Sequence, residues 1–181
     1  MLKGEFKTYE HNPPHLFVDD CPYMITAAIY DKKPYLSGDW EKGILFEVIC
    51  EFCQKFKWEL VDWVILDNHY HLILKSRLGT DLSKLMGGMH RKSANLIKKK
   101  QKLECKRFWW NYWDTCPKDE KQLYAMRNYV QYNPVKHGVV EDLKDYRWSS
   151  FISQFEELGR EEMEKRFRMY RFQHLKIRDD F

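Results

Sequence analysis

The chain has 181 residues, a length that fits one domain, 1–181, with enough residues to bury a core. Its hydrophobic content of 44% suits a globular protein, no apolar run approaches the ~18 residues of a membrane span, and no apolar signal segment opens the chain, so we expect a cytoplasmic protein. The formal charge of +4 permits nucleic-acid binding without indicating it, and five cysteines, an odd number, argue against a disulfide framework.

An irregular arm is expected over residues 1–20. The run His11-Asn12-Pro13-Pro14-His15 cannot form regular structure, because proline removes a backbone donor and restricts the residue before it. Histidines in such an arm either lie in solvent or reach a phosphate or an active site.

The next elements predict a sheet with one helix over it. Residues 22–30 carry apolar side chains on both faces, which predicts a central strand. Residues 39–57 have the apolar spacing of a helix. Residues 58–66 form a second predicted strand. Because Asp67-Asn68 is turn chemistry, this strand should pair with the following one, 69–74, as an antiparallel hairpin.

The second half continues the alternation. A helix over residues 81–102 contains Gly87-Gly88, which marks a close approach or a kink. After it we expect a strand over 108–113, a helix opened by Lys118 or Asp119, a docking segment over 146–151, and a charged helix from 155 to about 171 within a helical tail, 155–181. The order β–α–β–β–α–β–α predicts an α+β sandwich of ferredoxin-like type, an antiparallel sheet with helices packed mainly on one face.

Two histidines lie on one face of the predicted strand that begins at residue 69. Side chains alternate along a strand, so His69 and His71 point to one side while Tyr70, Leu72 and Leu74 point to the core. Neutral imidazole is a common metal ligand, so the pair suggests a metal site. The spacing alone also fits two surface side chains or a hydrogen-bonded pair.

A tyrosine and an amide share one face of the predicted helix that Lys118 or Asp119 opens. Tyr129 and Asn133 are four residues apart. Facing a His-x-His strand, they would form a metal-assisted nucleophile site. The alternatives are a surface position for Tyr129, and an N-cap role for Asn133 in a new turn that Pro134 opens and Gly138 closes. His137 is expected to be a cation at the helix end.

These motifs together resemble those of the REP-associated tyrosine transposases, single-strand DNA transposases with a His-hydrophobic-His motif and one catalytic tyrosine. The resemblance covers roughly residues 10–151. Besides His69-Tyr70-His71 and Tyr129-x-x-x-Asn133, it rests on the segments Asn133-Pro134-Val135-Lys136-His137-Gly138, His11-Asn12-Pro13-Pro14-His15-Leu16-Phe17, Trp110-Asn111-Tyr112-Trp113-Asp114 and Tyr146-Arg147-Trp148-Ser149-Ser150-Phe151.

The resemblance implies a nuclease that forms a covalent intermediate. Tyr129 would attack DNA and form a 5′-phosphotyrosine. His69, His71 and Asn133 would bind a divalent cation, and such a ligand set with water suits Mg²⁺ or Mn²⁺. The substrate would be single-stranded DNA in hairpins of repeated elements. Two departures stand out: Asp67 replaces a proline of the family, and Asn133 replaces a glutamine.

Two basic clusters are candidates for DNA contacts. The first ends the helix over 81–102 and precedes the aromatic strand, and the second lies in the C-terminal tail. A solvated helix cap and an amphipathic helix packed on the body are the respective alternatives. The first cluster comprises Lys98, Lys99, Lys100, Lys102, Lys106 and Arg107, and the second comprises Arg168 and Arg171.

Other functions fit the same residues less fully. A catalytically inactive module that binds single-stranded nucleic acid would need neither Tyr129 nor the histidine pair, and a structural dimerisation domain would bind nucleic acid weakly. Cys50 and Cys53 have no second cysteine pair and are expected to be helix thiols rather than zinc ligands. The oligomeric state, monomer or homodimer, stays open. Nucleoid association would follow if the protein acts on the chromosome.

Overall fold

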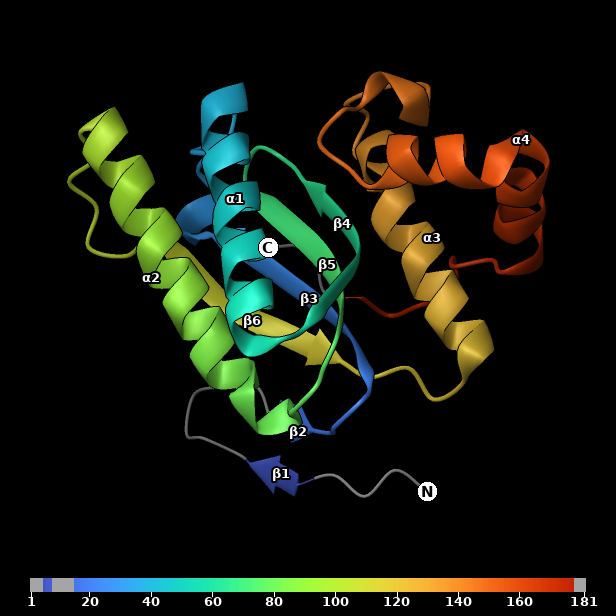
Figure 1. Ribbon diagram of the computed structural model, residues 1–181. Helices are drawn as coiled ribbons and strands as arrows, with labels where there is room; N and C mark the ends of the chain where they lie inside the picture. Colours follow the sequence, from blue (N-terminus) through green and yellow to red (C-terminus); the bar gives the residue numbers. More distant parts are fainter. Residues whose placement is uncertain (1–4, 8–14, 178–181) are drawn as a thin grey trace.

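A four-stranded antiparallel sheet, in the order β4-β5-β3-β6, organises the chain in the computed structural model, which describes residues 5–7 and 15–177 (Figure 1). The centre of the sheet holds β3 (Pro22–Ile29) and β5 (His69–Lys75), and its edges are β4 (Glu59–Ile65) and β6 (Trp109–Thr115). Both central strands are almost fully buried, which confirms the central position predicted for residues 22–30. The predicted hairpin of β4 and β5 is also confirmed.

The helices cover both faces of this sheet. On one face, α1 (Asp39–Phe56) and α2 (Leu82–Gln101) enclose the larger core (Figure 1). On the other face, α3 (Glu120–Lys136) packs over Met24 and Ile73 in a smaller core, with α4 (Phe151–Met169) beside it. The ferredoxin-like α+β fold is confirmed. One refinement concerns α3, which lies opposite the other two helices because both faces of the central strands are apolar and need cover.

Three short 3₁₀ helices and one peripheral strand pair complete the architecture of the described residues. The 3₁₀ helices are η1 (Tyr30–Lys32), η2 (Gly79–Asp81) and η3 (Leu143–Asp145). The strands β1 (Glu5–Lys7) and β2 (His15–Phe17) pair antiparallel, so the arm expected to be irregular contains regular structure. His11 and the side chain of His15 lie outside the described residues. No described helix combines the length and apolar character needed to cross a membrane.

The C-terminal region differs from the predicted helical tail. α4 starts at Phe151, four residues earlier than expected, and ends at Met169, so residues 170–177 continue without a helix. Gly159 interrupts α4 with a positive φ of 79°, a conformation that glycine adopts without steric cost. The tail therefore folds back in two helical pieces rather than as one helix, as Figure 1 shows.

The segment before α4 docks against the edge strand β4, as predicted for residues 146–151. Ser149 forms an antiparallel bridge with Val64, and the Tyr146 hydroxyl donates to the Ile65 carbonyl at 2.7 Å. Backbone groups of an edge strand otherwise remain unpaired, so this contact completes the β4 edge.

The predicted close approach at Gly87-Gly88 is found between α1 and α2. A Cβ atom on Gly88 would lie 2.2 Å from Cε1 of Phe52, whereas a Cβ atom on Gly87 would meet nothing within 4 Å. Gly88 therefore allows the two helices to approach, and Gly87 does not serve this purpose.

We expect Gly88→Ala to lower the free energy of unfolding by about 1–3 kcal/mol, because the added methyl group overlaps the Phe52 ring. The matched variant Gly87→Ala should raise it by up to ~1 kcal/mol through helix propensity alone. Urea denaturation measures both. Equal stability of the two variants would show that the close approach is not constrained, and Phe52→Leu should partly rescue Gly88→Ala.

Candidate active site

Four side chains from two elements meet on the face of the sheet that α3 covers. His69 and His71 of β5 point to this face, at 5% and 0% exposure, while Tyr70 between them points into the larger core. From α3, the Asn133 Oδ1 atom lies 3.1 Å from His69 Nε2, and the Tyr129 ring lies 5.4 Å from the His71 ring, centroid to centroid. The structure thus brings together the candidate metal ligands and the candidate nucleophile, whose roles remain predictions.

Burial keeps both imidazoles neutral. Desolvation lowers the pKa of His69 to about 4, with a further contribution from the charge of His137, and lowers the pKa of His71 well below its ordinary value. Each ring therefore carries one proton near neutral pH. The His69 Nδ1 atom lies 2.7 Å from Asn68 Oδ1, and the His71 Nδ1 atom lies 2.8 Å from Thr26 Oγ1.

The tautomer of each ring decides whether its Nε2 atom donates or accepts. Since an amide oxygen only accepts, one neutral tautomer of His69 donates from Nδ1–H to Asn68, and the other donates from Nε2–H to Asn133. His71 Nε2 and Asn133 Nδ2 are buried with no hydrogen-bond partner in the part of the chain that the structure describes. In the tautomer with the proton on Nδ1, the Nε2 lone pair of His69 points to the Asn133 oxygen 3.1 Å away, and a cation bound by both atoms would remove the repulsion between them.

The donor set fits a divalent cation. His69 Nε2 and Asn133 Oδ1 lie 3.1 Å apart, and an imidazole nitrogen and an amide oxygen are both atoms that could hold Mg²⁺ or Mn²⁺. The unpartnered His71 Nε2 atom supplies a further lone pair. Within residues 5–7 and 15–177, no group of three or more His, Cys, Asp or Glu side chains is placed to hold a metal, so a third protein ligand at this site would have to be the Asn133 amide.

A lysine that the sequence did not single out lies at the tyrosine. The Lys136 ammonium donates to the Tyr129 hydroxyl at 3.0 Å and lies 5.0 Å from the centroid of its ring. A positive charge next to a phenol favours its ionised form. The two residues are seven apart, two helical turns, and this spacing was the signal available in the sequence.

The end of α3 overturns one interpretation of Asn133. The helix runs unbroken through Asn133 and Pro134 to Lys136, so Asn133 is not the N-cap of a new turn. The expected glycine cap is present: Gly138 has a φ of 66°, and the bonds from Gly138 N to Val135 O and from the next residue to Pro134 O form a Schellman motif. The Asn133 side chain is therefore directed to His69 instead of to backbone amides.

Asp67 contacts a lysine and not an imidazole. Its Oδ1 atom accepts from Lys42 Nζ at 2.7 Å, and the Lys42 side chain is only 5% exposed. A buried ammonium needs a counter-charge, so Asp67 serves α1 and ties the turn before His69 to that helix. The departure from the family pattern at this position thus has a structural role in the contact with Lys42.

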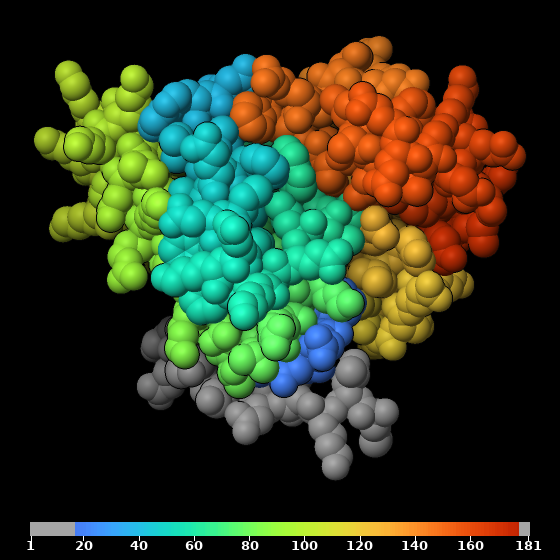
Figure 2. All heavy atoms as spheres, in the orientation of Figure 1, coloured from blue at the N-terminus to red at the C-terminus, as the bar shows by residue number. Residues whose placement is uncertain are grey.

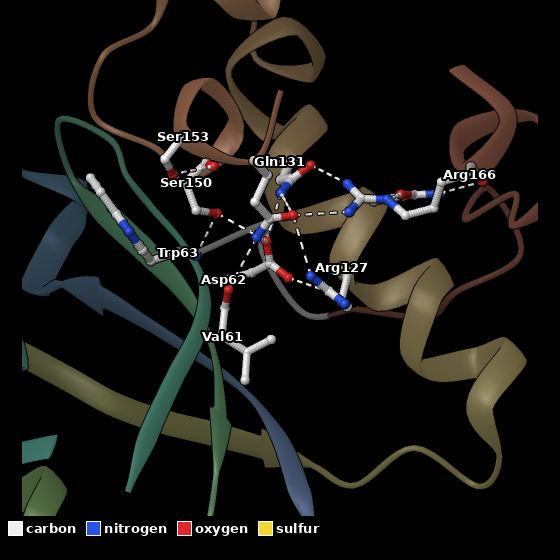
Figure 3. A network of polar contacts seen from close by, with 10 residues as sticks. Val61, Asp62, Trp63, Arg127, Gln131, Ser150, Ser153 and Arg166 are labelled. Atoms are coloured by element: carbon white, nitrogen blue, oxygen red, sulfur yellow. Dashed lines mark hydrogen bonds and ion pairs between the residues drawn. The ribbon is translucent and has the colours of Figure 1, made fainter. Parts of the chain in front are cut away.

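A buried polar network holds α3 against the edge strand β4 (Figure 3). Asp62 of β4 is fully buried, and its carboxylate accepts hydrogen bonds from four side chains of α3, α4 and the docking segment. Each of these donors belongs to an element that neighbours the active site or holds it in place. The donors are Arg127 Nε, Gln131 Nε2, Ser150 Oγ and Gln154 Nε2.

Arg166 extends this network into the second piece of α4. It donates to the side-chain oxygens of Gln131, Gln154 and Asn128. Burial lowers the pKa of Arg166 to about 10, which leaves the guanidinium charged at neutral pH. The spacing of these residues along the sequence does not predict the network.

The candidate DNA-contact residues lie at two separate places. The end of α2 and the end of α4 are on opposite sides of the molecule in Figure 1, and Figure 2 shows side chains of the α2 end projecting from the body. Lys98 donates to the Cys105 carbonyl, in the loop that follows α2. The exposed members are Lys99, Lys100, Lys102, Lys106 and Arg107 at the first place and Arg168 and Arg171 at the second.

Comparison with known proteins agrees with this fold. A REP-associated tyrosine transposase of Haemophilus influenzae is 29% identical over 146 residues, which are 71% of this chain and 78% of that protein. The structure of a REP-associated tyrosine transposase bound to a REP hairpin shares the fold, with a TM-score of 0.67, 20% identity, and coverage of 82% of this chain and 83% of that one. The family model described as "Transposase IS200 like" matches residues 17–133, the span that holds the histidine pair, Tyr129 and Asn133, and the chain therefore belongs to the IS200-like transposase family.

Proposed function

We propose that the protein is a metal-dependent single-strand DNA endonuclease and strand transferase that acts through a 5′-phosphotyrosine intermediate on hairpin-containing repeat DNA. The observation that carries the proposal is the convergence of a tyrosine ring with two neutral imidazoles and an amide oxygen in one buried site. The hairpin bound to the structurally similar transposase supports the choice of substrate.

The proposed reaction needs each of these groups in one role. His69, His71 and Asn133 would hold Mg²⁺ or Mn²⁺, which reduces the repulsion between a phosphodiester and an attacking oxygen and stabilises the leaving oxygen. The Tyr129 oxygen loses its proton and attacks phosphorus. The new O–P bond replaces the bond to the 3′ oxygen, which takes up a proton from water and leaves as a hydroxyl, while the phenol proton passes to water.

Lys136 would promote this attack. Its ammonium group hydrogen-bonds to the Tyr129 oxygen, so it stabilises the phenolate that must form. Because the phosphoester bond is exchanged and not hydrolysed, the strand can be rejoined without an external energy source.

A covalent-adduct assay tests the nucleophile. Mixed with DNA hairpins that carry single-stranded flanks and with Mn²⁺, the protein should form a DNA adduct that survives denaturation, and Tyr129→Phe should abolish it. Lys136→Ala should lower its rate roughly 10- to 100-fold, in line with loss of one hydrogen bond to a developing charge. Tyr132→Phe, a matched control on the same helix, should react normally.

Other outcomes have defined meanings. An adduct that persists in Tyr129→Phe and disappears in Tyr132→Phe would show that Tyr132, and not Tyr129, is the nucleophile. Absence of any adduct, together with salt-sensitive binding to single strands, would favour the alternative of an inactive binding module.

Metal binding has its own readout. Calorimetry with Mn²⁺ should show one site, which His71→Ala removes. Thr26→Val should weaken it about 10- to 100-fold, because the Thr26 hydroxyl orients the His71 ring through Nδ1. The paired substitution Cys50→Ser with Cys53→Ser is the control for an adventitious site and should change nothing. Retention of binding in His71→Ala would contradict the ligand assignment.

Burial of the imidazoles also predicts a pH dependence of stability. The pKa of His69 is about 4 when folded against about 6.5 when unfolded, so between these values the unfolded chain binds more protons. The stabilising contribution is complete above pH ~6.5, and it should be lost as pH falls toward 4, at up to about 1.4 kcal/mol per pH unit for each imidazole.

Urea denaturation of the metal-free protein over this range measures the slope. Replacement of both His69 and His71 by glutamine should reduce it, while His174→Gln at an exposed position should not. The remaining slope is expected from His90, whose burial lowers its pKa to about 3. An unchanged slope in the double variant would mean that the two rings are hydrated in solution.

A further inference from the structure

An exposed aromatic pair lies at the end of the sheet that carries His69. Tyr30 and Trp110, each 39% exposed, stack with ring centroids 4.9 Å apart and an angle of 28° between the rings. The central carbon of the Arg107 guanidinium lies 4.4 Å from the centroid of the Trp110 ring and 5.3 Å from that of Tyr30. Stacked aromatic rings with an arginine are the elements with which proteins hold unpaired bases.

A β-bulge in β6 turns Trp110 away from the larger core. One residue separates Ala27 from Ile29 in β3, whereas two residues separate their partners, Tyr112 and Trp109, in β6. Both partners pack on the larger core, so the extra residue lets Trp110 leave that face. Bulges of this kind re-aim a side chain beside an active site.

The bulge and His69 lie in the same row of the sheet. Ala28 of β3 pairs with His69 of β5, and the bulge lies opposite Ala28 on the other side of β3. Two strand spacings place the bulge about 10 Å from the backbone of His69. A nucleotide next to the one held at the histidines would reach Trp110 over this distance.

One side chain connects the two places directly. The Asn68 Oδ1 atom accepts from His69 Nδ1, and its Nδ2 atom donates to the carbonyl of Lys32, in the turn that begins at Tyr30. Asp31 and Lys32 in this turn have positive φ values of 59° and 53°, a conformation that non-glycine residues seldom adopt. The bond from Asn68 helps to hold this strained turn, and with it the Tyr30 ring.

Arg107 is oriented for contact with an anion beside the rings. Its Nε atom donates to the Trp109 carbonyl at 3.2 Å, and one terminal nitrogen donates to Asn111 Oδ1 at 3.1 Å. A guanidinium held in this way by neutral acceptors keeps its charge uncompensated, which suits a phosphate of the same strand.

We propose that Tyr30, Trp110 and Arg107 form a subsite for an unpaired nucleotide that neighbours the scissile phosphate. The base stacks on the aromatic pair, and Arg107 contacts the phosphate. This inference rests on the proposed function. It explains how the same site would select single-stranded DNA, because only an unpaired base can leave its stack to lie on the rings.

Binding of a labelled DNA hairpin with unpaired thymidine flanks tests the subsite, in a Tyr129→Phe background that prevents covalent capture. Fluorescence anisotropy should show that Trp110→Ala weakens binding roughly 5- to 100-fold, while Trp110→Phe retains most of it. Trp40→Ala is the matched control. Trp40 lies on α1, is 42% exposed, and has the Lys100 ammonium 5.6 Å from the centroid of its ring. This variant should bind as the background does.

An abasic scan separates stacking from loss of fold. A single abasic residue at one unpaired position should weaken binding by the parent protein and cause no further loss in Trp110→Ala, because the two changes remove the same contact. Losses that add at every position, or an equal loss in Trp40→Ala, would overturn the subsite.

The adduct assay distinguishes this failure from failure of the proposed function. With Tyr129 intact, Trp110→Ala should still form the adduct at saturating DNA, and a wild-type level of binding in that variant would overturn the subsite alone. If the wild-type protein formed no adduct and bound no single strand, both proposals would fall.

Discussion

The placement of α3 depends on one buried carboxylate. Asp62 of β4 has no exposure to solvent, and it accepts hydrogen bonds from α3, α4 and the docking segment. Removing one partner of a buried ion pair typically costs about 3–5 kcal/mol, so these elements are held strongly in one arrangement. Tyr129 and Asn133 project from the helix that this network holds, so the network is what keeps them opposite the histidines of β5.

Desolvation by the same packing prepares the histidines. Under α3, the two imidazoles are neutral, their Nδ1 atoms lie within hydrogen-bond distance of Asn68 and Thr26, and in the tautomers protonated at Nδ1 their Nε2 atoms carry lone pairs. An exposed pair would carry protons in mildly acid solution and would rotate freely. Covering this face of the sheet with a helix thus has a chemical consequence, because it leaves two oriented, neutral imidazoles of the kind that the proposed cation would need.

The strand pairing sets the direction in which a substrate strand would run. His69, Ala28 and the bulge of β6 follow one another across the sheet, so the proposed metal site and the aromatic pair lie in one row. Lys136 approaches the phenol from the end of α3. Each of these contacts comes from a different element, and the sheet supplies the common frame that makes their distances definite.

Several features of this protein follow from the sequence by itself, for local reasons. Apolar residues on both faces of residues 22–29 require a central strand, alternation places His69 and His71 on one face, and a four-residue spacing places Tyr129 and Asn133 together. These periodicities, with the family motifs, identified the four central residues of the candidate site. They left open whether Asn133 caps a turn, because cap and ligand share the same local sequence.

Only the tertiary structure decided the rest, because it depends on contacts between residues far apart in the chain. The cover of α3 over the second face, the Asp62 network and the pairing of Asp67 with Lys42 join elements separated by tens of residues. The bulge that re-aims Trp110 appears only when β6 is aligned with β3. Local propensity carries no information on such pairings, since they are selected by the packing of the whole chain.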